Sequence, residues 1–239
     1  AGPDATPEVA REELERCVAM SDHTDIGEQV SVPGRETHNP DGDGPRVGLI
    51  DCGAKGSIVS SLLERDAVVD VVPYDATVAD IERTDPDLLF ISNGPGDPEN
   101  FEAAAALVDE YVGSLPIAGI CLGQQVVANA LGGSTEKMEF GHRGVNQPVR
   151  DLRTNRVVMT TQNHGYTVAE PGDRLEVTQV NVNDDTPEGL ESDDLDVITR
   201  QYHPEANPGP NDSLDFFDDV LELAGYETER GATGAPKTT

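Results

Sequence analysis

The sequence predicts an α/β protein with a mostly parallel central sheet, helices on both faces of that sheet, and a β-rich C-terminal half. Three observations support this prediction. Short apolar runs alternate with helical stretches between residues 46 and 131. Glycine-rich turns follow several of these runs, at the sheet edge where such folds place ligands. After residue 133 the helical pattern gives way to β-like runs.

The expected elements follow in a regular order. In the first half we expect strands at 47–52, 68–72, 88–92 and 117–120, and helices at 57–65, 78–83, 101–112 and 124–131. Parallel neighbours need crossover connections, so this alternation is typical of a flavodoxin-like or Rossmann-like sheet. In the second half we expect strands at 145–152, 157–161, 166–168, 175–182 and 197–202, and a final helix at 213–224.

Residues 46–226 are expected to form one domain. Residues 1–45 comprise a charged helix, 7–20, and a connector rich in proline, glycine and aspartate. We interpret them as the linker and tail of a preceding domain that this chain lacks. Residues 227–239 are polar and contain glycine and proline, so we expect a disordered tail.

Composition limits the possible partners of this 239-residue chain. It carries 46 acidic against 16 basic residues, for a net charge of −30. Such an excess argues against binding to nucleic acid or to anionic membranes. Together with the scarcity of lysine and aromatic residues, it favours a halophilic origin, in which dense salt screens the repulsion. A solvated acidic surface in an ordinary organism is the alternative.

Cysteine and histidine spacing indicates neither a metal site nor a disulfide framework. The cysteines lie far apart, at Cys17, Cys52 and Cys121. We expect Cys52 in the core, Cys17 to be incidental and the compartment to be a reducing cytoplasm. His23, His38 and His142 have no ligand-like spacing, so no metal is expected. No apolar run approaches a spanning helix, and no signal peptide is visible.

The pentapeptide Gly-Ile-Cys-Leu-Gly at 119–123 follows the apolar run 115–120. Its form, G-x-C-x-G, is the thiol counterpart of the G-x-S-x-G nucleophile elbow. We expect a strand, a sharp turn at Cys121 and a helix from about Gln124. The sulfur would then lie at a helix N-terminus, where the dipole favours the reactive thiolate. A buried structural cysteine beside two turn glycines remains the alternative for this pentapeptide alone.

A second motif, Gln-Tyr-His-Pro-Glu at 201–205, follows another strand-like run. A cysteine nucleophile needs a base and a group that orients the base. Pro204 disfavours helical geometry at His203, so His203 and Glu205 should point to the same side. The tripeptide alone could be an ordinary loop, but together with the cysteine elbow it favours a catalytic arrangement.

Two further segments could complete such a site. Ser-Asn-Gly-Pro-Gly-Asp-Pro at 92–98 forms a rigid loop whose backbone N–H groups could stabilise an oxyanion. An ordinary β-to-α turn is its alternative reading. Gln-Asn-His-Gly-Tyr at 162–166 is a polar cluster between two β-like runs, and its alternative reading is a hairpin turn.

These four motifs together resemble class I (triad) glutamine amidotransferases. Within that family, the 92–98 motif, Ile-Asp-Cys-Gly-Ala-Lys at 50–55 and the Pro-Gly-Pro after His-Pro-Glu resemble the small, glutamine-hydrolysing subunits of carbamoyl-phosphate synthases. The resemblance covers about residues 46–224. It implies a cytoplasmic enzyme of pyrimidine and arginine biosynthesis.

The resemblance also implies residue roles. Cys121 would be the nucleophile, His203 the general base and acid, and Glu205 the orienting carboxylate. The backbone N–H groups of Gly96 and Leu122 would form the oxyanion hole. The α-amino and α-carboxylate groups of L-glutamine would be held by Gly94, Gln125, Asn163, Gly165 and Tyr166.

A partner is implied in the same way. Glutamine hydrolysis would proceed through a γ-glutamyl thioester, and ammonia would pass to a large synthetase subunit in a heterodimer or higher oligomer. ATP and magnesium would bind that partner, with no cofactor on this chain. The sequence departs from the family pattern at Gln124, where histidine is frequent, and in the N-terminal domain, which contributes a serine contact to glutamine. A catalytically silent glutamine-binding module and the amidotransferase of another synthetase remain alternatives.

Overall fold

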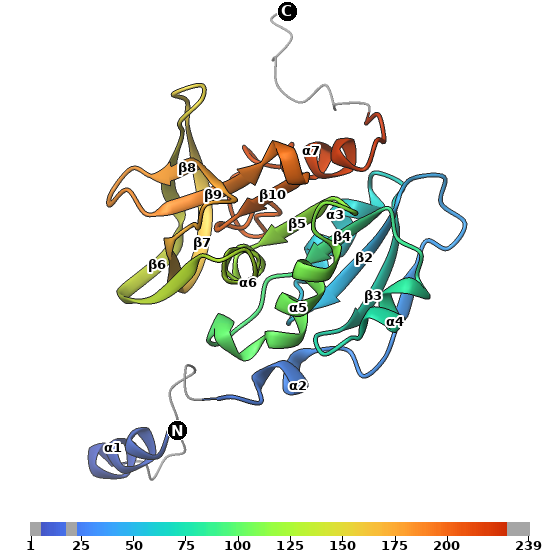
Figure 1. Ribbon diagram of the computed structural model, residues 1–239. Coiled ribbons are helices and arrows are strands. Elements are labelled where there is room, and N and C mark those ends of the chain that lie inside the picture. The colour runs from blue at the N-terminus through green and yellow to red at the C-terminus, as the bar shows by residue number, and fades with distance from the viewer. Residues whose placement is uncertain (1–5, 18–22, 229–239) are drawn as a thin grey trace, which may run out of the picture.

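One mixed sheet organises the part of the chain that the computed structural model describes, residues 6–17 and 23–228 (Figure 1). Its strands lie in the order β1-β3-β2-β4-β5-β10-β9-β8-β6-β7. They are β1 (Glu36–His38), β2 (Arg46–Asp51), β3 (Val68–Pro73), β4 (Leu88–Ile91), β5 (Ile117–Ile120), β6 (Ser134–Asp151), β7 (Val157–Glu170), β8 (Glu176–Asn181), β9 (Pro187–Ser192) and β10 (Val197–Arg200).

The sheet has a parallel part and an antiparallel part. Strands β3, β2, β4, β5 and β10 run parallel, while β1 and the strands from β9 to β7 pair antiparallel. The last strand, β10, inserts beside β5, with Arg200 opposite Ile120. Because parallel strands end at the same edge, the segments after β5 and β10 emerge next to each other.

Helices cover both faces of the parallel part. The helices of the described residues are α1 (Pro7–Arg16), α2 (Ile26–Val30), α3 (Gly56–Leu63), α4 (Val78–Glu82), α5 (Glu102–Tyr111), α6 (Leu122–Ala130) and α7 (Phe216–Leu223), with short 3₁₀ turns at Pro98–Asn100 and Asp193–Leu195. Side chains alternate along each strand. Ile50 of β2 therefore packs with α4, α5 and α6, while Leu49 packs with α3 and α7.

The first half matches the sequence prediction closely. All four parallel strands and all four helices lie where expected, apart from end shifts of a few residues. The second half matches in part, since β8, β10 and α7 lie within their expected ranges. The predicted strands 157–161 and 166–168 are one continuous strand, β7, paired along its length with β6. Strand β9 was not predicted, and β6 begins eleven residues before the expected 145. Strand β7 carries many polar residues because it lines a cavity. Its sequence therefore lacks a clear apolar alternation.

The range 1–45 contributes more than a connector to the domain. Strand β1 extends the sheet by pairing with β3, and Ile26 of α2 is buried in the core. Helix α1 buries none of its residues. Residues 18–20 of the predicted first helix and 229–239 of the predicted tail lie outside the described residues. Within the described ranges, every helix is too short or too polar to span a bilayer.

Candidate active site

Cys121 occupies a sharp turn between β5 and α6. Its backbone has φ 56° and ψ −104°, a conformation rarely adopted by residues with a side chain, and only 4 % of the residue is exposed. Its backbone N–H donates to the Arg200 carbonyl at 2.7 Å, which ties the turn to β10. The thiol therefore lies at the N-terminus of α6, as the elbow motif predicts.

The motif glycines allow this turn because neighbouring backbone passes very close. A Cβ on Gly123 would lie 2.1 Å from the carbonyl oxygen of Ile91, and one on Gly119 would lie 2.8 Å from the Gly123 carbonyl carbon. Real Cβ atoms do not approach backbone so closely, so any larger residue would force α6 away from β4 and β5. The glycines thus set how closely the helix carrying Cys121 packs on the sheet.

His203 and Glu205 stand beside this turn. The Nδ1 atom of His203 lies 2.7 Å from Oε1 of Glu205, and both residues are buried. The backbone N–H of His203 donates to the Thr161 carbonyl at 2.8 Å, which fixes the segment against β7. The Cys121 side chain contacts the imidazole on its other side. The structure therefore brings together the three residues predicted to be catalytic.

Lys55 also belongs to this cluster, although nothing in the sequence indicated that it contacts Glu205. Its ammonium lies 2.9 Å from Oε1 of Glu205 and donates to the Ala206 carbonyl at 2.7 Å. The residue belongs to the 50–55 motif, but more than a hundred residues separate it from Glu205. Only the close approach of the loops after β2 and β10 shows that Lys55 holds the carboxylate in place.

The electrostatics of the cluster favour a positive imidazole. Burial opposes protonation, but hydrogen bonds and charge from Cys121 and Glu205 outweigh it and raise the pKa of His203 to about 10. Burial likewise disfavours the charged form of Glu205, and contacts with His203 and Lys55 more than compensate, so the pKa of this carboxyl is lowered. The arrangement favours a proton on the imidazole, between Cys121 and Glu205.

A cavity of about 760 Å³ opens in front of Cys121. Its wall includes nine of the ten predicted site residues, all except Glu205: Gly94, Gly96, Cys121, Leu122, Gln125, Asn163, Gly165, Tyr166 and His203. Lys55, Lys137 and Arg143 also line it. The polar cluster at 162–166 reaches the cavity from within strand β7, so its interpretation as a hairpin turn is wrong.

The 92–98 loop is fixed to the loop after β2. The Ser92 hydroxyl accepts from the Cys52 N–H at 2.9 Å, and the Asn93 side-chain oxygen accepts from the Lys55 N–H at 2.9 Å. A Cβ on Gly94 would lie 2.2 Å from the Cys52 carbonyl oxygen, so only glycine fits there. These contacts hold Gly96, whose φ is +92°, at the cavity wall.

Two side chains connect the cavity walls. The Tyr166 hydroxyl donates to Oδ2 of Asp97 at 2.9 Å, which links β7 to the 92–98 loop. The Gln125 amide donates to the Tyr166 carbonyl at 2.8 Å and to the Gln201 side chain at 3.0 Å. Tyr166 and Gln125, two of the residues predicted to contact glutamine, therefore fix the shape of the cavity.

The other two cysteines lie outside the cavity. Cys52 is fully buried, and burial raises the pKa of its thiol strongly, which keeps it in the unreactive protonated form. Cys17 is exposed at the end of α1, and all three thiols are free. Among the cysteines only Cys121 combines an accessible cavity with a base.

A second histidine cluster was missed by sequence reasoning. His142 on β6 and His164 on β7 are direct cross-strand partners, and Glu188 on β9 is within 3.3 Å of His142. Hydrogen bonding to Glu188 raises the pKa of His142 to about 9 despite partial burial. Burial lowers the pKa of His164 to about 4. Spacing along the sequence did not indicate this cluster, because sheet pairing brings the three residues together.

A thiol, an imidazole and a carboxylate that meet at the carboxyl ends of parallel strands define a cysteine-nucleophile site on an α/β fold. The chain belongs to the class-I glutamine amidotransferase family, whose model matches residues 48–223.

Curated relatives share much of the sequence. The carbamoyl phosphate synthase small chain of Halobacterium salinarum is 67 % identical over 94 % of this chain. The small chain from Clostridium perfringens is 46 % identical over 81 % of this chain, and the pyrimidine-specific small chain of Bacillus subtilis is 44 % identical over 92 %. The matched regions span 63 %, 55 % and 61 % of those relatives, respectively.

Solved structures share the fold. A candidate GMP synthase component from Thermoplasma acidophilum superposes with a TM-score of 0.66 at 19 % identity, over 76 % of this chain and 94 % of that protein. A glutamine amidotransferase from Thermotoga maritima gives a TM-score of 0.55 at 16 % identity, with the same coverage. At such identities the likeness concerns the fold alone.

Proposed function

We propose that this chain hydrolyses the side-chain amide of L-glutamine to glutamate and ammonia, with Cys121 as the nucleophile. The main support is the contact between the Cys121 side chain and His203 at the wall of the 760 Å³ cavity. His203 is in turn held by Glu205. A cavity of this volume accommodates an amino acid. Gly94, Gln125, Asn163, Gly165 and Tyr166 would hold its α-amino and α-carboxylate groups.

Proton transfer would follow the hydrogen-bond chain. His203 takes the proton of the Cys121 thiol, and Glu205 stabilises the imidazolium that results. The thiolate attacks the amide carbon, and the imidazolium then gives its proton to the departing nitrogen, which leaves as ammonia. Water, deprotonated by the same imidazole, hydrolyses the γ-glutamyl thioester and regenerates the thiol.

The negative oxygen of the tetrahedral intermediate would be stabilised by backbone. Leu122 is the first residue of α6, and the first N–H groups of a helix have no intrahelical acceptor. The N–H of Gly96 comes from the 92–98 loop on the adjacent wall. Preorganised donors of this kind contribute about 2.7–4 kcal/mol each when their loss is measured.

Labelling tests the nucleophile. A chloroketone analogue of glutamine should alkylate Cys121, as mapped by mass spectrometry, and Cys121→Ala should abolish hydrolysis. Cys17→Ala is the matched control, because that thiol is exposed and distant from the cavity, and it should retain full activity. Modification of Cys17 or Cys52 with Cys121 untouched would refute the assignment.

The relatives' names extend the proposal to a partner. We propose that the ammonia is passed to a large synthetase subunit that makes carbamoyl phosphate from bicarbonate and ATP, with ATP and magnesium bound by that subunit. The proposed chemistry on this chain uses side chains, backbone N–H groups and water, with no cofactor. Support comes from the 67 % identity to a carbamoyl phosphate synthase small chain.

A complex assembled with such a large subunit tests this step. Glutamine should support carbamoyl phosphate formation with the wild-type chain but not with Cys121→Ala. Ammonium salt should restore synthesis with the variant, because it bypasses glutamine hydrolysis. Failure of the wild-type chain to stimulate synthesis from glutamine, although it hydrolyses glutamine alone, would exclude this partner and leave the hydrolase proposal standing.

A further inference from the structure

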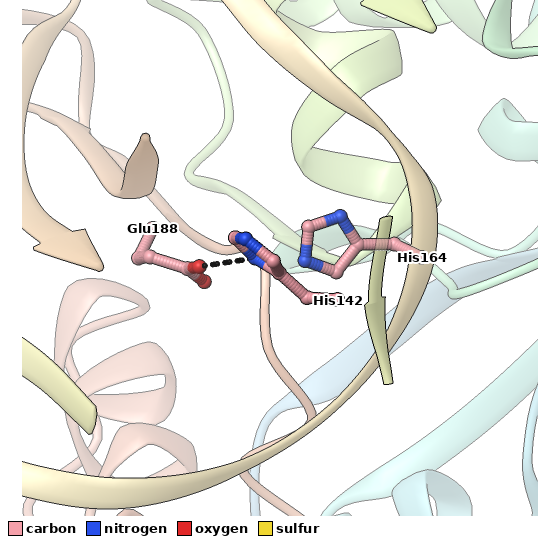
Figure 2. A group of neighbouring side chains, drawn as sticks. All are labelled: His142, His164 and Glu188. Atoms are coloured by element: carbon pink, nitrogen blue, oxygen red, sulfur yellow. Dashed lines mark ion pairs between the residues drawn. The ribbon is translucent and has the colours of Figure 1, made fainter. Parts of the chain in front are cut away.

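His142, His164 and Glu188 form a cluster (Figure 2) that adjoins the cavity, since His164 also lines the cavity wall. Each residue offers one ligand atom, and these atoms all lie within 4.8 Å of one another. The two imidazole rings meet edge to face, with centroids 4.9 Å apart. Figure 2 shows the His142 ring between the Glu188 carboxylate and the His164 ring.

Outer hydrogen bonds orient both rings. The Nε2 atom of His142 lies 2.8 Å from the Asp184 carboxylate, and Nδ1 of His164 lies 2.8 Å from the Tyr166 carbonyl oxygen. Both partners are acceptors, so these nitrogens carry the protons. The opposite nitrogens face the interior of the cluster. Nδ1 of His142 lies 3.3 Å from Oε1 of Glu188 and 3.4 Å from the Asn181 amide nitrogen, and Nε2 of His164 faces the Gln162 side chain. Metal-binding histidines have this arrangement, in which an outer oxygen fixes the ring.

Two acceptor atoms of the cluster, Oε2 of Glu188 and Nε2 of His164, lack a clear hydrogen-bond donor among the described residues. Glu188 is fully buried, and its Oε2 atom accepts no hydrogen bond from the residues that the structure describes. The Nε2 atom of His164 lies 3.1 Å from the side-chain oxygen of Gln162. With the His164 proton on Nδ1, this contact joins two lone pairs.

The orientation of the Gln162 amide follows from its neighbours. The Thr160 hydroxyl donates to the Gln147 carbonyl at 2.9 Å, so its oxygen is free to accept from Nε2 of Gln162 at 3.1 Å. In this orientation the Gln162 oxygen faces Nε2 of His164. A second proton on His164 would let its Nε2 atom donate to the Gln162 oxygen. Burial and the neighbouring His142 oppose a positive charge on His164, however.

We propose that His142 Nδ1, His164 Nε2 and the Glu188 carboxylate bind a divalent transition-metal ion, with zinc the best match to this donor set. Two imidazoles and a carboxylate are a known zinc ligand set, and the Gln162 oxygen or water could supply the fourth position.

The geometry is close to what such an ion needs. Bonds of about 2.0–2.2 Å in a tetrahedron place ligand atoms about 3.3 Å apart. The His142 Nδ1 to Glu188 Oε1 distance is already 3.3 Å. Binding would require His164 to rotate closer and the Asn181 amide, which donates to Glu188 Oε1 at 3.1 Å, to give way to the ion. Binding displaces any proton on His142 Nδ1 to solvent. The ion would brace the part of β7 that carries Asn163, Gly165 and Tyr166, without touching the reacting atoms.

Zinc binding by the full chain tests the proposal. The Cys121→Ala variant removes the competing cavity thiol, and after chelator treatment, zinc loading and desalting it should retain one zinc per chain. In this background Glu188→Gln should lose the bound zinc. Asp184→Asn, which alters only an outer partner, should weaken zinc affinity about 10- to 100-fold. His38→Gln, on β1 at the opposite sheet edge, is the matched control and should bind zinc unchanged.

X-ray absorption on the zinc-loaded wild-type chain keeps the test independent of variant folding. Nitrogen and oxygen neighbours at about 2.0–2.1 Å, with an imidazole pattern, are expected. A sulfur neighbour at about 2.3 Å would place the ion on a cysteine and overturn the proposal. So would the absence of zinc from Cys121→Ala, or equal zinc affinity in folded Glu188→Gln.

Discussion

Cys121 shows how residue-scale strain can serve chemistry. A left-handed backbone at a non-glycine residue costs about 1–3 kcal/mol and persists only where the surroundings hold it. Here the surroundings are the Cys121 N–H bond to Arg200 and the close glycine contacts with β4 and β5. In this conformation the Cys121 side chain contacts His203.

Glu205→Gln should impair the proposed hydrolysis while leaving the site assembled. Glutamine can still accept from Nδ1 of His203 but carries no charge to stabilise the imidazolium. We expect kcat to fall by about 10²–10⁴-fold. The pKa of His203 should fall below about 10, because a negative neighbour that favours protonation has been removed. NMR titration of the ring and steady-state kinetics measure both effects.

The same variant should alter the dependence of stability on pH. A histidine whose folded pKa is raised from 6.5 to about 10 contributes stability that is complete below pH 6.5 and lost as pH rises through about 10. The stability difference between wild type and Glu205→Gln should therefore shrink above that pH. Glu36→Gln is the matched control, because Glu36 lies 4.0 Å from His38 outside the cavity. An equal response in both variants would contradict the assignment.

Tyr166→Phe should weaken glutamine binding more than it slows turnover. The change removes the 2.9 Å hydrogen bond to Asp97 that links two cavity walls. A hydrogen bond to a charged group contributes about 1.5–3 kcal/mol, and for this half-buried site we expect the lower end, a rise in KM of about tenfold.

A double-mutant cycle isolates the contact. Asp97→Asn should weaken binding in a similar way, and the double variant should be little worse than either single one. Tyr111→Phe is the control, since its hydroxyl bonds to the Val78 carbonyl away from the cavity. Full additivity would show that the two side chains do not act through each other.

At the scale of elements, the short helix α4 depends on its first turn. The Asp80 carboxylate accepts from the Thr77 N–H at 2.8 Å and from the Thr77 hydroxyl at 2.5 Å. These bonds hold the helix start, and Ile81 in the same helix is fully buried in the core. Capping here is therefore linked to the folding of the whole domain.

Thr77→Ala should lower the free energy of unfolding by about 1 kcal/mol. Hydrogen bonds from the Thr77 side chain and backbone lower the pKa of Asp80 from 3.8, so their contribution is present above pH 3.8 and is lost as pH falls through the folded value. The difference from wild type should shrink in acid. Thr6→Ala is the control: Thr6 caps α1, which buries none of its residues, so global stability should not change.

At the scale of the whole molecule, charge is unevenly distributed. The chain has a net charge of −30, yet two of its three lysines, Lys55 and Lys137, line the cavity together with Arg143. Lys55 is paired with Glu205, and all three basic side chains place positive charge at the cavity wall. This distribution favours the approach of a ligand that carries a carboxylate.

The fold should be more stable in concentrated salt. Carboxylate repulsion is screened beyond about 10 Å at 0.1 M and beyond about 3 Å at 1 M ionic strength. The melting temperature should therefore rise between 0.1 and 2 M KCl, which calorimetry can measure. Sucrose at matched water activity is the control for general exclusion effects. A melting temperature independent of KCl would argue against a halophilic origin.

Much of the geometry of the candidate site could be predicted from local patterns in the sequence. The parallel strands, the Cys121 elbow and the His203–Glu205 pair depend on residues close together in the chain. Their geometry follows from strand alternation, glycine contacts and the restriction that Pro204 imposes. The sequence by itself also determined the charge and hence the expected response to salt.

Only the tertiary structure decided the contacts between distant segments. Strand β7 runs unbroken through the polar residues 162–166 because β6 pairs with it along its length. Lys55 meets Glu205 because β2 and β10 end at the same sheet edge. His142, His164 and Glu188 gather through sheet register and curvature. Local sequence patterns do not predict these contacts, because the contacts arise from hydrogen bonding and packing between elements that lie far apart in the chain.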